Sequence, residues 1–112
     1  MNDVLQQLAT TLEARKQSDP EQSYVASLHQ KGLNKILEKV GEEATEVILA
    51  AKDAHFDGGH KALVGEVADL WFHSMVMLSH LDVDINEVTA CLQQRFGISG
   101  HDEKAARGNQ DN

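Results

Sequence analysis

Apolar residues recur at helical spacing along almost the whole chain, and this pattern constrains the fold more than any other feature. Between residues 33 and 54 the apolar positions lie three or four apart, which places them on one face of a helix. No segment of about four to eight residues alternates polar and apolar side chains as a half-buried strand would. The sequence therefore predicts an all-α fold.

Residues that favour helix ends divide this pattern into segments. Asp3 and Asp84 can cap the N-termini of the first and the last helix, while Gly32 and Gly97 are placed to end two helices. The expected helices are one that begins near Asp3, a short one around residues 24–28, and three that cover about 33–54, 63–81 and 85–96. We expect a helical bundle of about four to five helices.

The segment of residues 63–81 is apolar almost all round, so a helix there must be covered on most sides. A chain of 112 residues offers few helices to do this, and self-association is the natural remedy. We therefore expect the bundle to be completed by homodimerisation. Residues 1–96 are predicted to form one domain, and residues 97–112, which have no apolar stripe, a flexible C-terminal tail.

Charge and apolar content exclude several classes of partner. The formal net charge is −8 and lysine and arginine form no dense cluster, which argues against binding to nucleic acid or to an anionic membrane. No apolar stretch approaches the ~20 residues that a membrane-spanning helix needs. The single cysteine, Cys91, and a charged N-terminal segment that is unlike a signal peptide predict a cytoplasmic location.

Two pairs of acidic residues interrupt the helical pattern. Glu43 and Glu46 are three apart on one predicted helix, and Glu66 and Asp69 are three apart in the apolar segment of another, where water is hard to reach. Facing helices would place the four carboxylates around one volume, where two charges about 5.5 Å apart repel by about 3 kcal/mol at an effective dielectric constant of about 20. A divalent cation would remove that repulsion. A solvated acidic face is the alternative interpretation of the first pair.

The chemistry of these side chains indicates which metal they would bind. All of them offer carboxylate oxygens, and no histidine follows a glutamate at the spacing of a di-iron site. Mg²⁺ fits such a site best, and Mn²⁺ can substitute. Because Mg²⁺ often shares its coordination with substrate phosphates, the site predicts a phosphorylated ligand. Lys35 and Lys39 lie on the same side of the helix and could bind a phosphate or merely pair with the acids.

Three longer stretches carry a resemblance to a known family. They are SYVASLHQKGLNKILEKVGEEATEVILAAKD, EVADLWFHSMVMLSHLDVD and RFGISGHDEKAAR, and they resemble the phosphoribosyl-ATP pyrophosphatase family of the all-α nucleoside triphosphate pyrophosphatase superfamily. The likeness extends over roughly residues 4–107. It implies a cytoplasmic, Mg²⁺-dependent homodimer that hydrolyses phosphoribosyl-ATP to phosphoribosyl-AMP and pyrophosphate, the second step of histidine biosynthesis.

The resemblance also implies roles for individual residues. Those that would bind the metal are Glu43, Glu46, Glu66 and Asp69. The adjacent Glu42 would be either a further ligand or the catalytic base that orients water. The metal would neutralise charge on the transferring phosphate, and positioned lysines would stabilise the leaving pyrophosphate.

Three further residues have a functional and a structural interpretation. His73 lies four residues after Asp69 on the same helix face, so it could bond a ligating carboxylate or be a satisfied core histidine. Lys104 and Arg107 match the family's ending and could fold over a substrate phosphate, whereas a solvated tail is the alternative.

Two other functions remain open at this point. The first is a pyrophosphatase that acts on another nucleoside triphosphate, because the acidic site would recognise the triphosphate and says little about the base. The second is a non-catalytic helical dimerisation module whose acids form only a solvated face.

Overall fold

The computed structural model describes residues 4–97 of the chain. The helices are α1 (Val4–Arg15), α2 (Tyr24–Lys31), α3 (Leu33–Asp57), α4 (Lys61–His80) and α5 (Ile85–Phe96). Between residues 4 and 97 there are helices and turns but no strand, which confirms the predicted all-α class and the number of helices. The expected cap at Asp3 lies outside the described residues, as does all of the predicted tail beyond Gly97.

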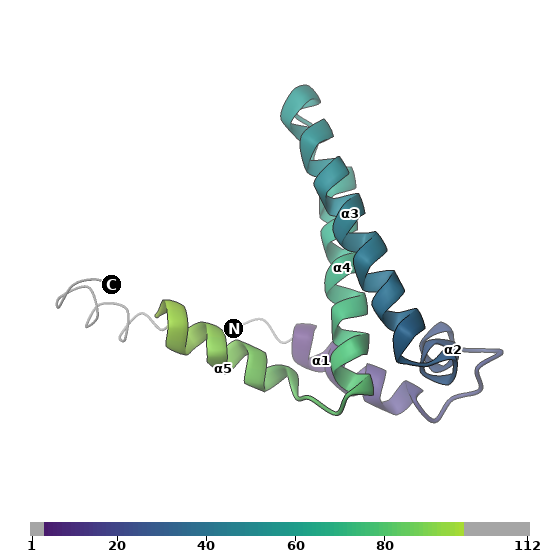
Figure 1. Cartoon of the computed structure of the whole chain (residues 1–112). Coiled ribbons are helices and arrows are strands. Elements are labelled where there is room, and N and C mark those ends of the chain that lie inside the picture. Colours follow the sequence, from purple (N-terminus) through teal and green to yellow (C-terminus); the bar gives the residue numbers. More distant parts are fainter. Residues whose placement is uncertain (1–3, 98–112) are drawn as a thin grey trace. The chain divides into compact units, whose positions relative to one another are not determined.

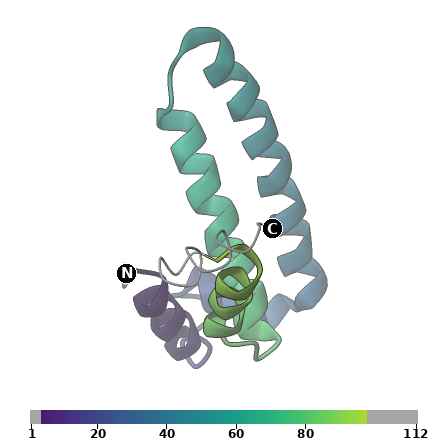
Figure 2. The ribbon, with the colours of Figure 1, turned by 90° about the vertical axis from the view of Figure 1, so that its left-hand side faces the viewer.

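The chain divides into two compact units, which are described separately. The first ends at Asp82 and contains α1 to α4, and the second begins at Val83 and contains α5. The first unit is built on an antiparallel hairpin of α3 and α4, which lie side by side in both views (Figures 1 and 2). The prediction of a single domain over residues 1–96 therefore stays a prediction.

Glycines set the ends of α2 and α3. Gly32 has a φ of 101° and its N–H donates to the carbonyl of Leu28, so α2 ends there and α3 begins at the next residue. Gly58 takes the left-handed conformation with a φ of 76°, which a residue with a side chain rarely adopts, and its N–H donates to the carbonyl of Ala54. The helix expected to end near residue 54 therefore continues to Asp57.

The helices α1 and α2 pack at the end of the hairpin where α3 begins and α4 ends (Figure 1). The α2 helix is capped by Ser23, whose hydroxyl accepts a hydrogen bond of 3.1 Å from the backbone N–H of Ala26. The buried apolar core is formed by all four helices. Its residues are Leu12, Val25, Ala26, Leu28, Ile36, Met75 and Val76.

The hairpin extends beyond this core and exposes apolar side chains. Ile36 is the only fully buried residue of α3, so the continuous buried face expected for residues 33–54 does not form within one chain. Exposed apolar side chains on α3 and α4 include Ile48, Leu49, Val64 and Trp71. The sequence predicts a buried position for Ile48 and a covered segment around Val64 and Trp71, and in the single chain that cover is incomplete.

The second unit holds α5, whose two ends agree with the sequence. The Asp84 carboxylate accepts a hydrogen bond of 2.8 Å from the N–H of Asn86, which caps the N-terminus. At the other end, Gly97 adopts the left-handed conformation and its N–H donates to the carbonyl of Gln93. Both predicted helix ends are confirmed.

No helix in the part of the chain that the structure describes combines the length and the apolar character needed to cross a membrane.

Candidate functional site

Three carboxylates gather where α3 and α4 run side by side. Glu43 comes from α3, and Glu66 and Asp69 lie about one turn apart on α4. One oxygen from each carboxylate can be chosen so that all three lie within 4.8 Å of one another. The Glu43 side chain is only 13% exposed, Glu66 is partly buried and Asp69 is exposed, so the group is reached from solvent on one side.

The charge of this group is not paired with a lysine in the part of the chain that the structure describes, and the basic side chain beside it is His73. Within residues 4–97, none of the ion pairs formed by lysine side chains involves Glu43, Glu66 or Asp69. Desolvation, and after it the negative charges of Glu46, Asp69 and Glu43, raises the pKa of Glu66 above its ordinary value. Crowded carboxylate oxygens without a lysine partner are a donor set that suits a hard divalent cation.

His73 lies beside this group and is buried. Its Nδ1 is 3.1 Å from the backbone carbonyl oxygen of Asp69 and 3.7 Å from Oε2 of Glu43. Its Nε2 is 2.8 Å from the hydroxyl of Tyr24. The sequence left two interpretations of His73 open, a bond to a ligating carboxylate and a satisfied core histidine. Its hydrogen bonds go to a backbone carbonyl and a tyrosine, and Glu43 is in electrostatic contact.

The remaining predicted acids lie at the margin of the group. Glu42 is one residue before Glu43, and its carboxylate is 3.3 Å from Nζ of Lys39. Glu46 is exposed and is not among the three whose oxygens come together, although its charge contributes to the raised pKa of Glu66. The structure thus brings together Glu43, Glu66 and Asp69, with Glu42 and Glu46 on either side along α3.

The predicted phosphate-binding lysines are both engaged with acids of α3. Lys35 is 3.5 Å from Glu38, and Lys39 is 3.3 Å from Glu42. The hydrogen bond to Glu42, followed by electrostatic interactions with Tyr24 and Glu42, raises the pKa of Lys39 above its ordinary value. Pairing with acids was one of the two interpretations that the sequence left open. Lys104 and Arg107 lie outside the described residues.

Sequence reasoning missed Tyr24. It is separated from His73 by 49 positions, and no helical spacing links residues on two different helices so far apart. Only the packing of α2 against the hairpin brings the hydroxyl to the imidazole.

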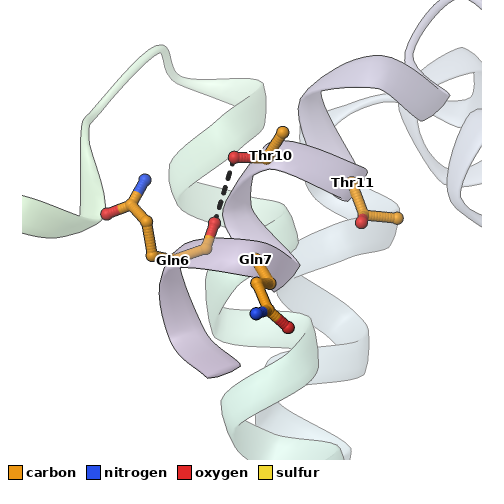
Figure 3. A pocket seen from close by; sticks show the side chains of 4 residues that line it. All are labelled: Gln6, Gln7, Thr10 and Thr11. Carbon is orange, nitrogen blue, oxygen red and sulfur yellow. Dashed lines mark hydrogen bonds between the residues drawn. The ribbon is translucent and has the colours of Figure 1, made fainter. Parts of the chain in front are cut away.

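A shallow pocket lies elsewhere, on α1. Figure 3 shows that it is lined by Gln6, Gln7, Thr10 and Thr11, all from one helix. The hydroxyl of Thr10 already donates to the carbonyl of Gln6 at 3.1 Å. The pocket offers no charged side chain and shares no residue with the cluster of Glu43, Glu66 and Asp69, so we assign it no role.

Comparison with known proteins identifies the family. The family model described as phosphoribosyl-ATP pyrophosphohydrolase matches residues 5–96. The chain belongs to the phosphoribosyl-ATP pyrophosphohydrolase family. It is also 57% identical over 110 residues to a protein of Hydrogenovibrio crunogenus named phosphoribosyl-ATP pyrophosphatase, with 98% of this chain and 97% of that protein covered. The three acids, His73 and Tyr24 all lie within the region that the phosphoribosyl-ATP pyrophosphohydrolase model matches.

Proposed function

We propose that this chain is a phosphoribosyl-ATP pyrophosphatase, which hydrolyses phosphoribosyl-ATP to phosphoribosyl-AMP and pyrophosphate in the second step of histidine biosynthesis. The proposal rests above all on the relative of that name, which is 57% identical over nearly the full length of both chains. The three clustered carboxylates, which could hold a divalent cation, support the proposal.

The metal is Mg²⁺ in this proposal, with Mn²⁺ as a substitute. The ligands are Glu43, Glu66 and Asp69, and Glu46 is a fourth that joins from the next turn of α3. Carboxylate oxygens from two facing helices fit the preference of Mg²⁺ for hard oxygen donors, and an exposed side leaves room for water and substrate phosphates. When bound, the metal neutralises phosphate charge and lowers the pKa of the attacking water.

The residues beside the ligands would activate the water and bind the phosphates. Glu42 is either a further ligand or the base that takes a proton from the water as its oxygen attacks the α-phosphorus. The bond between that phosphorus and the bridging oxygen of the β-phosphate then breaks, and pyrophosphate leaves. Lys39 and Lys35, on the same helix, carry the positive charge that can accept the phosphates if they exchange their pairing with Glu42 and Glu38.

The proposal includes a homodimer in the cytoplasm and a substrate-binding tail. The exposed apolar side chains of α3 and α4, among them Ile48, Leu49 and Trp71, provide a surface that a second copy would cover. Lys104 and Arg107 are proposed to contact substrate phosphates from the end of the chain. Sedimentation of the purified protein tests the dimer, and kinetics after deletion of residues 97–112 test the tail.

The experiment that tests the function is a substrate panel followed by phosphorus NMR. Phosphoribosyl-ATP, ATP and other nucleoside triphosphates are each incubated with the protein and Mg²⁺. We expect pyrophosphate and phosphoribosyl-AMP from phosphoribosyl-ATP, with no comparable turnover of the others. Preferred cleavage of another triphosphate would favour the rival substrate, and no cleavage of any would favour a non-catalytic dimerisation module.

The panel needs a control that separates the site from a contaminating enzyme. Glu66→Gln removes one proposed ligand, and Asp53→Asn removes an exposed acid on α3 that lies outside the group. Activity that is lost in the first variant and kept in the second belongs to this protein and to this site.

A further inference from the structure

The hydroxyl of Tyr24 is the one polar group outside the hairpin that reaches the imidazole beside the carboxylates, among the contacts of residues 4–97. Tyr24 is the first residue of α2, and its hydroxyl lies 2.8 Å from Nε2 of His73. The capping of α2 by the buried Ser23 fixes the point at which this helix begins. The backbone that carries the half-exposed Tyr24 side chain is thus set by the helix cap, and the contact with His73 places its hydroxyl.

The contacts of His73 decide which ring nitrogen carries the proton. Nδ1 lies 3.1 Å from the carbonyl oxygen of Asp69, which can only accept, so Nδ1 must be the donor. In the neutral ring Nε2 then has a lone pair and accepts from the Tyr24 hydroxyl. The Asp69 carbonyl selects this tautomer, and the Tyr24 hydroxyl, which can donate or accept, donates to the lone pair that the tautomer leaves on Nε2.

The choice of tautomer matters because Nδ1 faces the proposed metal site. It is 3.7 Å from Oε2 of Glu43, whose side chain is 13% exposed. With the proton on Nδ1, the positive end of the N–H dipole faces this carboxylate. With the proton on Nε2, a lone pair would face both the carboxylate and the Asp69 carbonyl, and Glu43 would be pushed away.

Packing contacts hold the ring in this orientation. His73 meets Tyr24 edge-on at a centroid distance of 5.8 Å and meets Phe72 edge-on at 5.1 Å. The rings of Tyr24 and Phe72 are stacked at 6.5 Å with an interplanar angle of 17°. A phenylalanine at position 24 could keep these ring contacts and lose only the hydroxyl, so the hydrogen bond can be tested without removing the packing.

We propose that Tyr24 is a positioning residue of the active site, which acts through His73 to hold Glu43 in the orientation that binds the metal. This inference rests on the proposed function for its effect on turnover, but its effect on the imidazole and on metal affinity does not depend on the substrate. Outer partners of metal ligands typically change affinity or activity by about 10-fold to 100-fold when they are removed.

The test uses Tyr24→Phe and a matched control on the same helix, Ser27→Ala. The Ser27 hydroxyl donates to the Tyr24 carbonyl at 2.7 Å, so the control also removes one hydroxyl hydrogen bond from α2 without touching His73. In the metal-free full chain, nitrogen NMR of the His73 ring should show a changed hydrogen-bond state at Nε2 in Tyr24→Phe and no change in Ser27→Ala.

Metal affinity and kinetics supply the second measurement. We expect Tyr24→Phe to weaken Mn²⁺ binding by about ten-fold, and to lower kcat by a similar factor with KM within about two-fold of the wild type. In a His73→Gln background Tyr24→Phe should have no further effect, because the imidazole through which Tyr24 acts on Glu43 is absent.

Several outcomes would overturn the proposal. They are Mn²⁺ affinity that is unchanged in Tyr24→Phe, an equal loss in Ser27→Ala, an unchanged imidazole spectrum, or a raised KM with normal kcat, which would indicate direct substrate contact instead. If the wild type does not cleave phosphoribosyl-ATP, the proposed function fails, but the spectrum and the Mn²⁺ affinity still decide the role of Tyr24.

Discussion

At the end of the first unit where α1 and α4 meet, two acidic side chains share one lysine, whereas midway along the hairpin three acids share none. Nζ of Lys16 lies 2.7 Å from Glu13 and 3.2 Å from Asp82. Burial works to lower the pKa of Lys16, but hydrogen bonds to Glu13 and Asp82, together with their charges, raise it overall. The bond to Asp82 links residues 66 positions apart, and each acid of this Lys16 cluster has the lysine as a partner.

The three carboxylates of Glu43, Glu66 and Asp69 lie together without a lysine partner. Each acid comes from a well-formed helix, so the crowding is imposed by the packing of α3 on α4. An acid that lies next to a lysine stabilises the folded structure. Acids that lie next to one another raise each other's pKa, and their unpaired negative charge can attract a cationic ligand. The difference suggests that the first cluster serves stability and the second serves binding, and the following predictions test that division.

The largest effect is expected from removal of the metal. Exhaustive chelation should abolish pyrophosphate release from phosphoribosyl-ATP, because the crowded acids alone repel the phosphates, and added Mg²⁺ should restore it. Circular dichroism should show that the helices remain, since the Lys16 cluster and the core need no metal. Full turnover after chelation would contradict the assignment.

Neutralising one acid of the group should have the next largest effect. We expect Glu66→Gln and Asp69→Asn each to lower kcat by about 100-fold or more, because an amide is a poor replacement ligand for Mg²⁺. Without metal, both variants should be as stable as the wild type or more stable, because one of several crowded charges is gone. Steady-state kinetics measure the loss of kcat, and urea denaturation measures the metal-free stability, with Asp53→Asn as the control. A marked loss of metal-free stability in both variants would show that these acids, like the Lys16 cluster, serve stability.

The Lys16 cluster should respond in the opposite way. Lys16→Met should lower the free energy of unfolding by about 1 kcal/mol or less, since it leaves Glu13 and Asp82 unpaired near the surface. Turnover and Mn²⁺ affinity of this variant should match the wild type. Urea denaturation measures the free energy of unfolding, and isothermal titration measures the Mn²⁺ affinity. A weakened Mn²⁺ affinity would show that the Lys16 cluster and the three acids are not independent.

The smallest effect concerns a histidine pair beside Lys16. Nδ1 of His29 lies 2.9 Å from Nδ1 of His80. Burial, and after it the positive charges of His80 and Lys16, lowers the pKa of His29 below its ordinary value of 6.5, with Glu13 opposing. The unfolded chain then binds this proton at a higher pH than the folded one, so the free energy of unfolding should fall as the pH drops below 6.5.

Urea denaturation between about pH 7 and about pH 5 measures this effect. His29→Gln should make the free energy of unfolding depend less on pH, whereas His55→Gln, which changes an exposed histidine of α3, should leave the dependence unchanged. An equal pH dependence in the wild type and in His29→Gln would rule out this source of acid sensitivity.

Much of the fold follows from local signals in the sequence. Asp84 and Gly97 mark the ends of α5 because a capping carboxylate and a left-handed glycine act within one helical turn. The sequence predicts too early an end for α3, because the weak helix propensity of residues 55–57 does not by itself stop the helix, which ends where Gly58 takes its positive φ. Exposed Trp71 shows the limit of the pattern, which indicates that a face is apolar but not what covers it.

The site could be anticipated only in part. The spacing of Glu66 and Asp69 puts them on one face of α4, which is a local property of a helix. Whether Glu43 or Glu46 lies closest to them depends on how α3 crosses α4, and the structure brings Glu43 into the group. The contact between Tyr24 and His73 depends on the docking of α2, so no local pattern could reveal it.

The most direct test of a metal-binding role for the unpaired acids is isothermal titration of the metal-free full chain with Mg²⁺ and with Mn²⁺. We predict saturable binding to the wild type and to Asp53→Asn, and binding weakened by at least about ten-fold in Glu66→Gln and in Asp69→Asn. Binding that is absent from the wild type, or equally strong in all four proteins, would contradict the assignment of Glu43, Glu66 and Asp69 as the metal site.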